Sequence, residues 1–322
     1  MQNCYNFALV IIWNIMLKNF LLTILLVLTL PSNAQEDRFP LDSLPYDAII
    51  NSTLGGKRMK YFGKLDFTLS QAYFENWISG GENAFNGILH LDYNFNYSNR
   101  KGWVWDNNLM ISLGGNKTSG SKIVKKADDR FEINSQLGKQ INQFWNYAVY
   151  LNFKSQLLPG FRYYEEDGVE KKDKSTRIFS PTIMQLGIGW YYKKNRNSWV
   201  NLSPLSARGI LVGAAYTRDL PEGQKYFGVK KGKTSLLNLG GSINGFFKLF
   251  LMDNITMENK FNVYANYIQK VQNIDFEVNT ILRMKVNKRI SSNLIAHFLY
   301  DDDLIGRLQI RELFGAGLSI DL

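Results

Sequence analysis

The sequence predicts an all-β fold, namely a transmembrane antiparallel β-barrel of about 12 strands preceded by an N-terminal signal peptide. The clearest support lies in three consecutive segments, 237–251, 254–268 and 272–287, in which apolar and polar residues alternate almost without interruption. A period of two residues is typical of β-strands, because successive side chains point to opposite faces. Each segment exceeds the roughly 9 to 11 residues that a tilted strand needs to cross a bilayer, whereas globular strands usually have about five or six.

The alternation also assigns the two faces of the predicted barrel. A soluble sheet with one wet face alternates as well, so strand length rather than alternation favours the membrane. The apolar face is expected to meet lipid and the polar face an enclosed lumen. Twelve strands are expected near residues 58–72, 84–98, 102–113, 130–140, 145–157, 180–193, 198–218, 237–251, 254–268, 272–287, 290–301 and 308–322.

The connections between these segments alternate in length, which is typical of bacterial barrels with short periplasmic turns and long outer loops. This pattern places both termini on the periplasmic side, with residues 269–271 as the one short outer connection. Segment 198–218 is long for one strand and contains Ser203-Pro204, and proline cannot donate a hydrogen bond within a sheet. The sequence leaves open whether this segment forms one bent strand or two.

Residues 1–34 are expected to be a signal peptide: a short basic region at Lys18 precedes the apolar run from Phe20 to Leu30, and small residues end the segment. The true start is expected at Met16. An uncleaved anchor helix is the rival interpretation. Residues 35–57, with two prolines and no steady period, are expected to form a periplasmic tail, and residues 58–322 the barrel.

The chain carries a formal charge of +10, which invites a nucleic-acid interpretation. We reject that interpretation because the basic residues are spread over loops and alternate with acids on the strands. Lysines in residues 114–129 and 219–236 are instead candidates for pairing with outer-membrane lipid, including the phosphates of lipopolysaccharide, and a solvated loop surface is the alternative interpretation. The one cysteine, Cys4, lies in the predicted signal peptide, so the exported chain would have no disulfide.

Three stretches resemble a family of exported Bacteroidota proteins known only as domain of unknown function 3078. They are residues 67–83, Asn201-Leu-Ser-Pro-Leu205, and Tyr300-Asp-Asp-Asp303 with Leu308-Gln-Ile-Arg-Glu312. The resemblance runs from about residue 60 to the end, and it implies an outer-membrane location without an assigned activity. Its most specific signature comprises Asn76, Trp77, Gly80, Gly81 and Asn83. A structural role is expected for it, since the two glycines suit a turn.

The inward face is expected to be polar and nearly balanced in charge, because lone ionised groups in a confined lumen are costly. A balanced lumen argues against a strongly ion-selective pore, which would show a ring of one sign. The lumen-facing polar candidates are His90, Asp92, Lys248, Glu258, Lys260, Arg283, His297 and Arg311.

An enzyme is the least favoured class. His90 and Asp92 share a face, as do His297 and Asp301, but no serine has a recognisable spacing to either histidine. No cofactor or metal site is expected, since Asp301-Asp302-Asp303 lacks the later glutamate of a calcium loop.

The sequence therefore predicts an integral outer-membrane protein that is a non-enzymatic structural or interaction component of an envelope complex, with envelope proteins as partners. A small-solute channel or transporter is the first alternative and an outer-membrane hydrolase the second. Twelve strands give a lumen between the filled eight-stranded barrels and the open porins, so strand number does not separate these.

Overall fold

A computed structural model describes residues 58–73, 82–166, 168–195, 197–268, 274–287, 289–302 and 306–322. Contacts divide the chain into Met1–Leu44 and Pro45–Leu322, and everything described belongs to the second unit. The predicted signal peptide and tail therefore lie outside the described residues. Within the described ranges no helix has the length and apolar character needed to cross a membrane.

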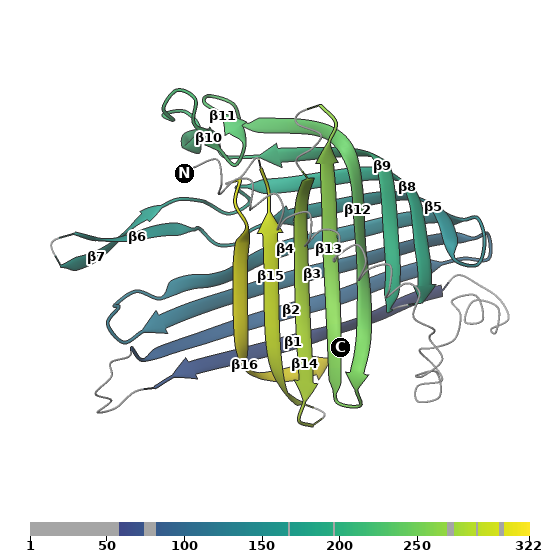
Figure 1. Ribbon diagram of the computed structural model, residues 1–322, viewed down its shortest axis with the longest axis horizontal. Coiled ribbons are helices and arrows are strands. Elements are labelled where there is room, and N and C mark those ends of the chain that lie inside the picture. Colours follow the sequence, from purple (N-terminus) through teal and green to yellow (C-terminus); the bar gives the residue numbers. More distant parts are fainter. Residues whose placement is uncertain are drawn as a thin grey trace, which may run out of the picture. The chain divides into compact units, whose positions relative to one another are not determined.

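Twelve antiparallel strands close into a barrel, as the alternation predicted (Figure 1). Barrel strands that follow one another along the chain are hydrogen-bonded to each other. β1 also pairs with β16 and closes the ring, with Lys64 opposite Asp321. The strands are β1 (Arg58–Ala72), β2 (Ala84–Ser98), β3 (Trp103–Thr118), β4 (Lys125–Gln140), β5 (Trp145–Ser155), β8 (Thr182–Asn195), β9 (Ser198–Leu211), β12 (Ser235–Met252), β13 (Ile255–Asn266), β14 (Ile274–Lys285), β15 (Ile290–Tyr300) and β16 (Gln309–Asp321).

The two ends of the barrel differ as expected from the connection lengths. One end, here the turn end, carries the short connections, and the other, the loop end, carries the long ones. Two loops contain small sheets that the sequence did not predict: β6 (Phe161–Glu166) with β7 (Val169–Lys174), and β10 (Lys225–Tyr226) with β11 (Val229–Lys230). A 3-10 turn, η2 (Ala214–Tyr216), precedes β10. The β6–β7 hairpin projects beyond the barrel strands (Figure 1).

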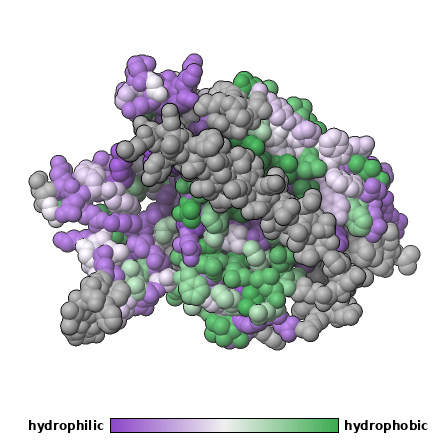
Figure 2. Space-filling view, viewed as in Figure 1, coloured by the Kyte–Doolittle hydropathy of each residue, from purple (hydrophilic) through white to green (hydrophobic). Residues whose placement is uncertain are grey.

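The barrel is polar inside and apolar outside. Among the described residues, eleven apolar side chains are buried against twenty-six polar or charged ones, the reverse of a soluble core. Large apolar side chains on the strands are exposed instead, for example Leu237 at 68% and Phe314 at 58%. Figure 2 shows hydrophobic surface over the strands and hydrophilic surface over the projecting loops. The predicted assignment of faces is therefore correct.

Segment 198–218 forms a single strand that ends at Leu211, and it contains a bulge. The pairing of β9 with both neighbours shifts at residues 203–205, so β9 carries one extra residue there. Ser203 and Ser206, three apart, consequently both point into the barrel, while Leu205 between them is 60% exposed. The residues of the Asn201–Leu205 stretch thus build the bulge.

Tyr267 secures this bulge from outside. Its hydroxyl donates a hydrogen bond of 3.0 Å to the carbonyl oxygen of Pro204. A Cβ added to Gly241 would collide with the Tyr267 hydroxyl, so the glycine makes room for the tyrosine.

Replacing Tyr267 by phenylalanine is expected to lower the free energy of unfolding by about 1–3 kcal/mol, because the Pro204 carbonyl loses its donor on an apolar wall. Urea unfolding of the refolded barrel in neutral detergent measures the change. Tyr61→Phe is the matched control, since within the described part of the chain the Tyr61 hydroxyl donates only to the sulfur of Met59, at 3.7 Å. An equal loss in both variants would contradict the assigned role.

Exposed aromatic side chains lie at the turn end: Trp103, Trp105, Tyr147 and Trp190 are 41–60% exposed. Tyr191, the neighbour of Trp190 on β8, is buried and does not belong to this exposed group. Side chains alternate regularly along β8, so Trp190 faces outward and Tyr191 faces inward, where its hydroxyl donates to Asp106 at 3.1 Å.

Candidate functional site in the barrel lumen

The lumen is crossed by ion pairs that join opposite walls. β4 and β14 lie six strands apart in either direction around the closed barrel, so they face each other across its full width. Arg130 on β4 nevertheless lies 3.1 Å from Glu277 on β14. Glu277 also contacts His297 at 3.0 Å and the ammonium of Lys154, so one carboxylate gathers three basic groups. We name Arg130, Glu132, Lys154, Glu277 and His297 the Glu277 hub.

A second contact spans the barrel nearer its middle. Lys260 on β13 lies 2.9 Å from the Asp92 carboxylate on β2, five strands away by the shorter route. The same ammonium contacts the side-chain oxygen of Asn108 at 3.4 Å and the sulfur of Met110 at 2.8 Å, both on β3. Long side chains from both walls therefore meet in the described part of the lumen.

Other ion pairs brace strands that are closer together. Arg283 binds both oxygens of Asp66 at 2.8 Å each, and both side chains are less than 8% exposed. Arg311 binds both oxygens of Asp128, at 2.6 and 2.9 Å.

Near the loop end, Arg208 contacts Asp275 at 2.6 Å and also Asp301. Lys248 and Glu258, 2.9 Å apart, are directly paired residues on adjacent strands, so this contact runs along the wall.

The structure places the predicted lumen candidates on the inward face, but it distributes them over separate contacts instead of gathering them in one site. Sequence reasoning missed Asp128, because residues 114–129 were assigned to a loop and β4 in fact begins at Lys125. It also missed Arg130, although this residue is the first of the expected strand 130–140. It missed Arg208 because the bulge at 203–205 shifts the inward parity of β9. The shared parity of Arg130 with Glu132, Asn134 and Gln136 was the signal that could have identified it.

Three residues of hydrolase type stand in a row on the inward face. Asp66, His90 and Ser112 are cross-strand neighbours on β1, β2 and β3. The Ser112 hydroxyl, however, donates to Asp128 at 2.5 Å, and Asp66 is held by Arg283. No hydrogen bond links His90 to Ser112 or Asp66 within the described part of the chain. His297 likewise contacts Glu277 and not Asp301. The aspartate, histidine and serine of a possible triad therefore lie near one another, but Ser112 and Asp66 form hydrogen bonds with other residues.

Uncharged amides line another part of the lumen. Asn201, Asn244 and Asn262 are cross-strand neighbours on β9, β12 and β13. Gln136 donates to Asn201 and Asn262 donates to Gln185, both at 3.4 Å. Five buried side-chain atoms of Gln136, Gln185, Asn244 and Asn262 have no protein partner among the described residues. Such donors and acceptors suit water or a neutral polar solute.

No group of three or more His, Cys, Asp or Glu suited to a metal ion occurs in the described ranges. Of the predicted signature, Asn76, Trp77, Gly80 and Gly81 lie outside the described residues. Asn83 is described, and its carbonyl oxygen accepts a 2.8 Å hydrogen bond from the backbone amide of Ser119.

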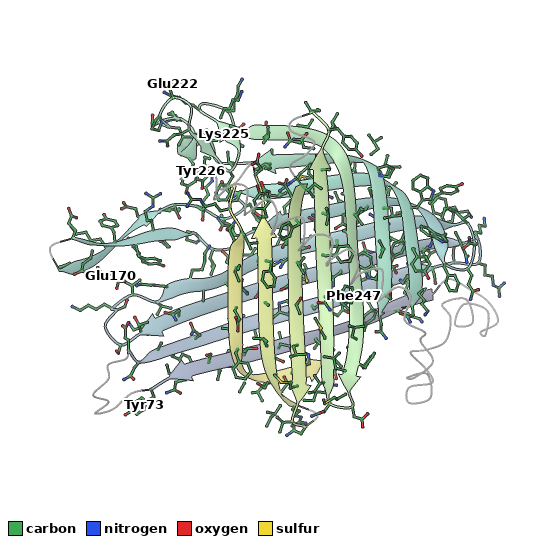
Figure 3. All side chains as sticks on the ribbon, viewed as in Figure 1. Tyr73, Glu170, Glu222, Lys225, Tyr226 and Phe247 are labelled. Atoms are coloured by element: carbon green, nitrogen blue, oxygen red, sulfur yellow. The ribbon has the colours of Figure 1, made fainter. Side chains whose placement is uncertain are left out.

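The β6–β7 hairpin is attached to β4 by a charged contact. Lys125 lies 2.6 Å from one Glu170 oxygen, and the Ser121 hydroxyl donates to the other at 2.5 Å. Figure 3 shows Glu170 on this projecting hairpin. The hydrogen bonds from Lys125 and Ser121 hold the pKa of Glu170 below its ordinary value.

Acidification is therefore expected to loosen the hairpin. A carboxyl with a lowered pKa stabilises its contact fully above its unfolded-state pKa, about 4.3, and loses it as the pH falls through the lowered value. Spin labels on Val169→Cys and Val124→Cys should give a distance distribution that is narrow at pH 7 and broadens below about pH 4. Glu170→Gln should be broad already at pH 7.

Glu166→Gln is the matched control, because among the described residues Glu166 pairs with Lys171, inside the hairpin, at 2.5 Å. A distribution that is the same in wild type and Glu170→Gln at pH 7 would show that the contact does not hold the hairpin.

Comparison with known families gives one match: the family described as Protein of unknown function (DUF3078) matches residues 69–161. This range includes the predicted signature. The segments 201–205 and 300–312 lie outside it, so the resemblance is supported over a shorter part of the chain than the sequence suggested. None of the curated proteins matches the chain.

Solved barrels resemble the chain only distantly. The translocator domain of the autotransporter NalP from Neisseria meningitidis has 10% sequence identity and a TM-score of 0.31, with 85% of this chain and 91% of that chain covered. An outer membrane channel from Pseudomonas putida F1 has 10% identity and a TM-score of 0.35, with 84% and 96% covered.

Proposed function

We propose that this chain is an integral outer-membrane protein with a closed lumen, which acts as a non-enzymatic structural or interaction component of an envelope complex. The observation that carries the proposal is the contact of Arg130 with Glu277 across the full width of the barrel. A barrel whose interior is occupied by its own paired side chains offers its surface, not its lumen, for function. The turn end and both termini face the periplasm in this proposal.

Its apolar outer wall supports the membrane location. Exposed leucine and phenylalanine side chains over a closed sheet without free edges are what the hydrocarbon region of a bilayer requires. The loop end supports an interaction role, because two of its loops fold into small sheets of their own, and one of them projects beyond the strands.

Two measurements on the native protein test the proposal. The mature chain should fractionate with the outer membrane, and gentle solubilisation followed by capture of the chain should recover the same envelope proteins in repeated preparations. The purified barrel should give no current steps in a planar bilayer. Recovery in the soluble periplasmic fraction would refute the location, and steady conductance by the wild-type barrel would refute the closed lumen.

A small-solute channel is the second candidate, and the unpartnered amide atoms of Gln136, Gln185, Asn244 and Asn262 favour it. A lumen lined by uncharged hydrogen-bonding groups would favour the passage of water or neutral solutes over that of ions. Swelling of proteoliposomes in glycerol or urea, without ion conductance, would support this candidate, and the absence of swelling would remove it.

A hydrolase remains the third candidate because Asp66, His90 and Ser112 are neighbours. We expect no hydrolysis of phospholipid or peptide by the purified barrel, since Ser112 and Asp66 have other partners. Activity that disappears in both His90→Ala and Ser112→Ala would overturn the non-enzymatic assignment.

A further inference from the structure

One row of side chains on the outer wall at the turn end holds a lysine between aromatic rings. The row crosses four neighbouring strands, β3, β4, β5 and β8 (Figure 1). Trp103 pairs directly with Lys139. Lys139 pairs in turn with Tyr147, and Tyr147 with Trp190. Directly opposed residues share a face of the sheet, and the three aromatic side chains are 43–60% exposed, so these four residues, the Lys139 row, face outward.

The Lys139 ammonium is directed toward the turn between β2 and β3. It lies 5.5 Å from the centre of the Trp103 ring, and it donates a hydrogen bond to the carbonyl oxygen of Lys101. A lysine ammonium has three N–H donors, of which the Lys101 carbonyl uses one. Because Lys139 is exposed, its other donors are open to a ligand that approaches along the outer wall.

The turn between β2 and β3 is fixed by local hydrogen bonds and carries two further positive charges. The side-chain oxygen of Asn99 accepts hydrogen bonds from the backbone amides of Lys101 and Trp103, at 2.9 and 3.1 Å. Gly102 has a φ of 74°, a left-handed conformation that glycine adopts without strain. Arg100 and Lys101 are exposed on this turn. Their backbone is therefore ordered before any ligand binds.

No acidic side chain offsets this charge. Segments 98–105 and 137–149 contain three basic residues, Arg100, Lys101 and Lys139, and no aspartate or glutamate. None of these three has an ion-pair partner within the described ranges. Asp106, the next acid along β3, pairs with Lys193 inside the barrel. Uncompensated cations at one place on a surface attract an anionic ligand, so the turn and Lys139 suit a phosphate.

The next outward row toward the middle of the barrel is apolar. Trp105 pairs with Leu137. Leu137 pairs in turn with Val149, and Val149 with Ile188, and all four side chains are 41–52% exposed. Leu137 and Lys139 are two residues apart on β4, so the two rows lie about 7 Å apart. From the turn toward the middle, the wall presents positive charge, then aromatic rings, then apolar surface, which matches a phospholipid from its phosphate to its acyl chains.

We propose that the Lys139 row and the β2–β3 turn together form a binding site for an anionic phospholipid. Lys139 and Lys101 bind the phosphate, and the adjoining apolar row takes an acyl chain. A lipid is favoured over a free anion because the strand register places the apolar row directly beside the charged one. This inference rests on the proposed membrane location, and in the proposed orientation the lipid belongs to the inner leaflet.

The test compares phosphatidylglycerol with phosphatidylcholine of the same acyl chains, so that only the headgroup charge differs. Native mass spectrometry of the mature barrel in neutral detergent measures how much of each lipid is retained. Wild type is expected to bind phosphatidylglycerol about tenfold more tightly, at about fivefold or less per lysine. K101Q/K139Q should abolish most of this preference. Trp103→Leu should reduce it about twofold to fivefold, because Lys139 loses the ring that positions its ammonium.

K285Q/R289Q is the matched control, because it removes the same charge from the turn end. Lys285 pairs with the buried Ser291 and so lies on the inward face of β14, and the preference should remain intact. Retention of the folded state is checked by heat-modifiable electrophoretic mobility. Equal binding of the two lipids by wild type, an unchanged preference in K101Q/K139Q, or an equal loss in the control would overturn the inference. Full displacement of the lipid by millimolar glycerol phosphate would show a free-anion site instead. Soluble fractionation would refute the membrane location separately.

Discussion

Replacing Arg283 by leucine is expected to lower the free energy of unfolding by about 3–5 kcal/mol, because the substitution leaves the Asp66 carboxylate buried without its cation. Asp66 accepts two hydrogen bonds of 2.8 Å from Arg283, and both side chains are less than 8% exposed. A loss of this size approaches the whole stability of a small domain. Urea unfolding of the purified barrel in detergent, followed by tryptophan fluorescence, measures it.

Two further variants separate the contribution of the Arg283–Asp66 ion pair from that of the surrounding packing. The double variant with leucine at both positions should recover most of the loss, since apolar replacement of a buried pair is often close to neutral. Lys248→Leu is the matched control: its pair with Glu258 is about one-fifth exposed, so water screens the remaining carboxylate and the loss should be smaller. A double variant that is as unstable as Arg283→Leu would show that the effect is one of packing.

The sequence predicted the strands of the barrel wall and their two faces far better than the contacts between side chains in the lumen. Alternation over long segments places each residue inside or outside, and it gave β1 and β2 with the bounds that the structure has. Inward parity does not say which opposite wall a side chain will reach. The pairing of Arg130 with Glu277 depends on strand tilt and barrel width, which no local pattern encodes.

Local irregularity caused the other differences. The bulge in β9 shifts the alternation of inward and outward side chains between Ser203 and Ser206. Arg208 was therefore not predicted to face the lumen. The sheets of the β6–β7 and β10–β11 loops are too short for a period to be recognised, and they depend on contacts with the barrel, such as Lys125 with Glu170.

The double variant Arg130→Ala/Glu277→Ala is expected to turn a silent barrel into one that shows reproducible current steps in a planar bilayer. The substitutions delete the side chains that meet across the full width of the lumen and remove one charge of each sign. The remaining lining is mixed in sign, so the steps should show weak ion selectivity. Adding Lys260→Ala/Asp92→Ala removes the second spanning contact and should enlarge the steps.

Lys248→Ala/Glu258→Ala provides the control that decides what such steps mean. It deletes the same amount of charge, but this pair joins adjacent strands and lies along the wall, so the barrel should stay silent. Steps of equal size in both double variants would point to general loosening of the barrel. Silence in the Arg130 and Glu277 variant would show that this contact does not close the lumen. Conductance confined to the spanning variants would mean that the interior is shut by the residues that meet in it.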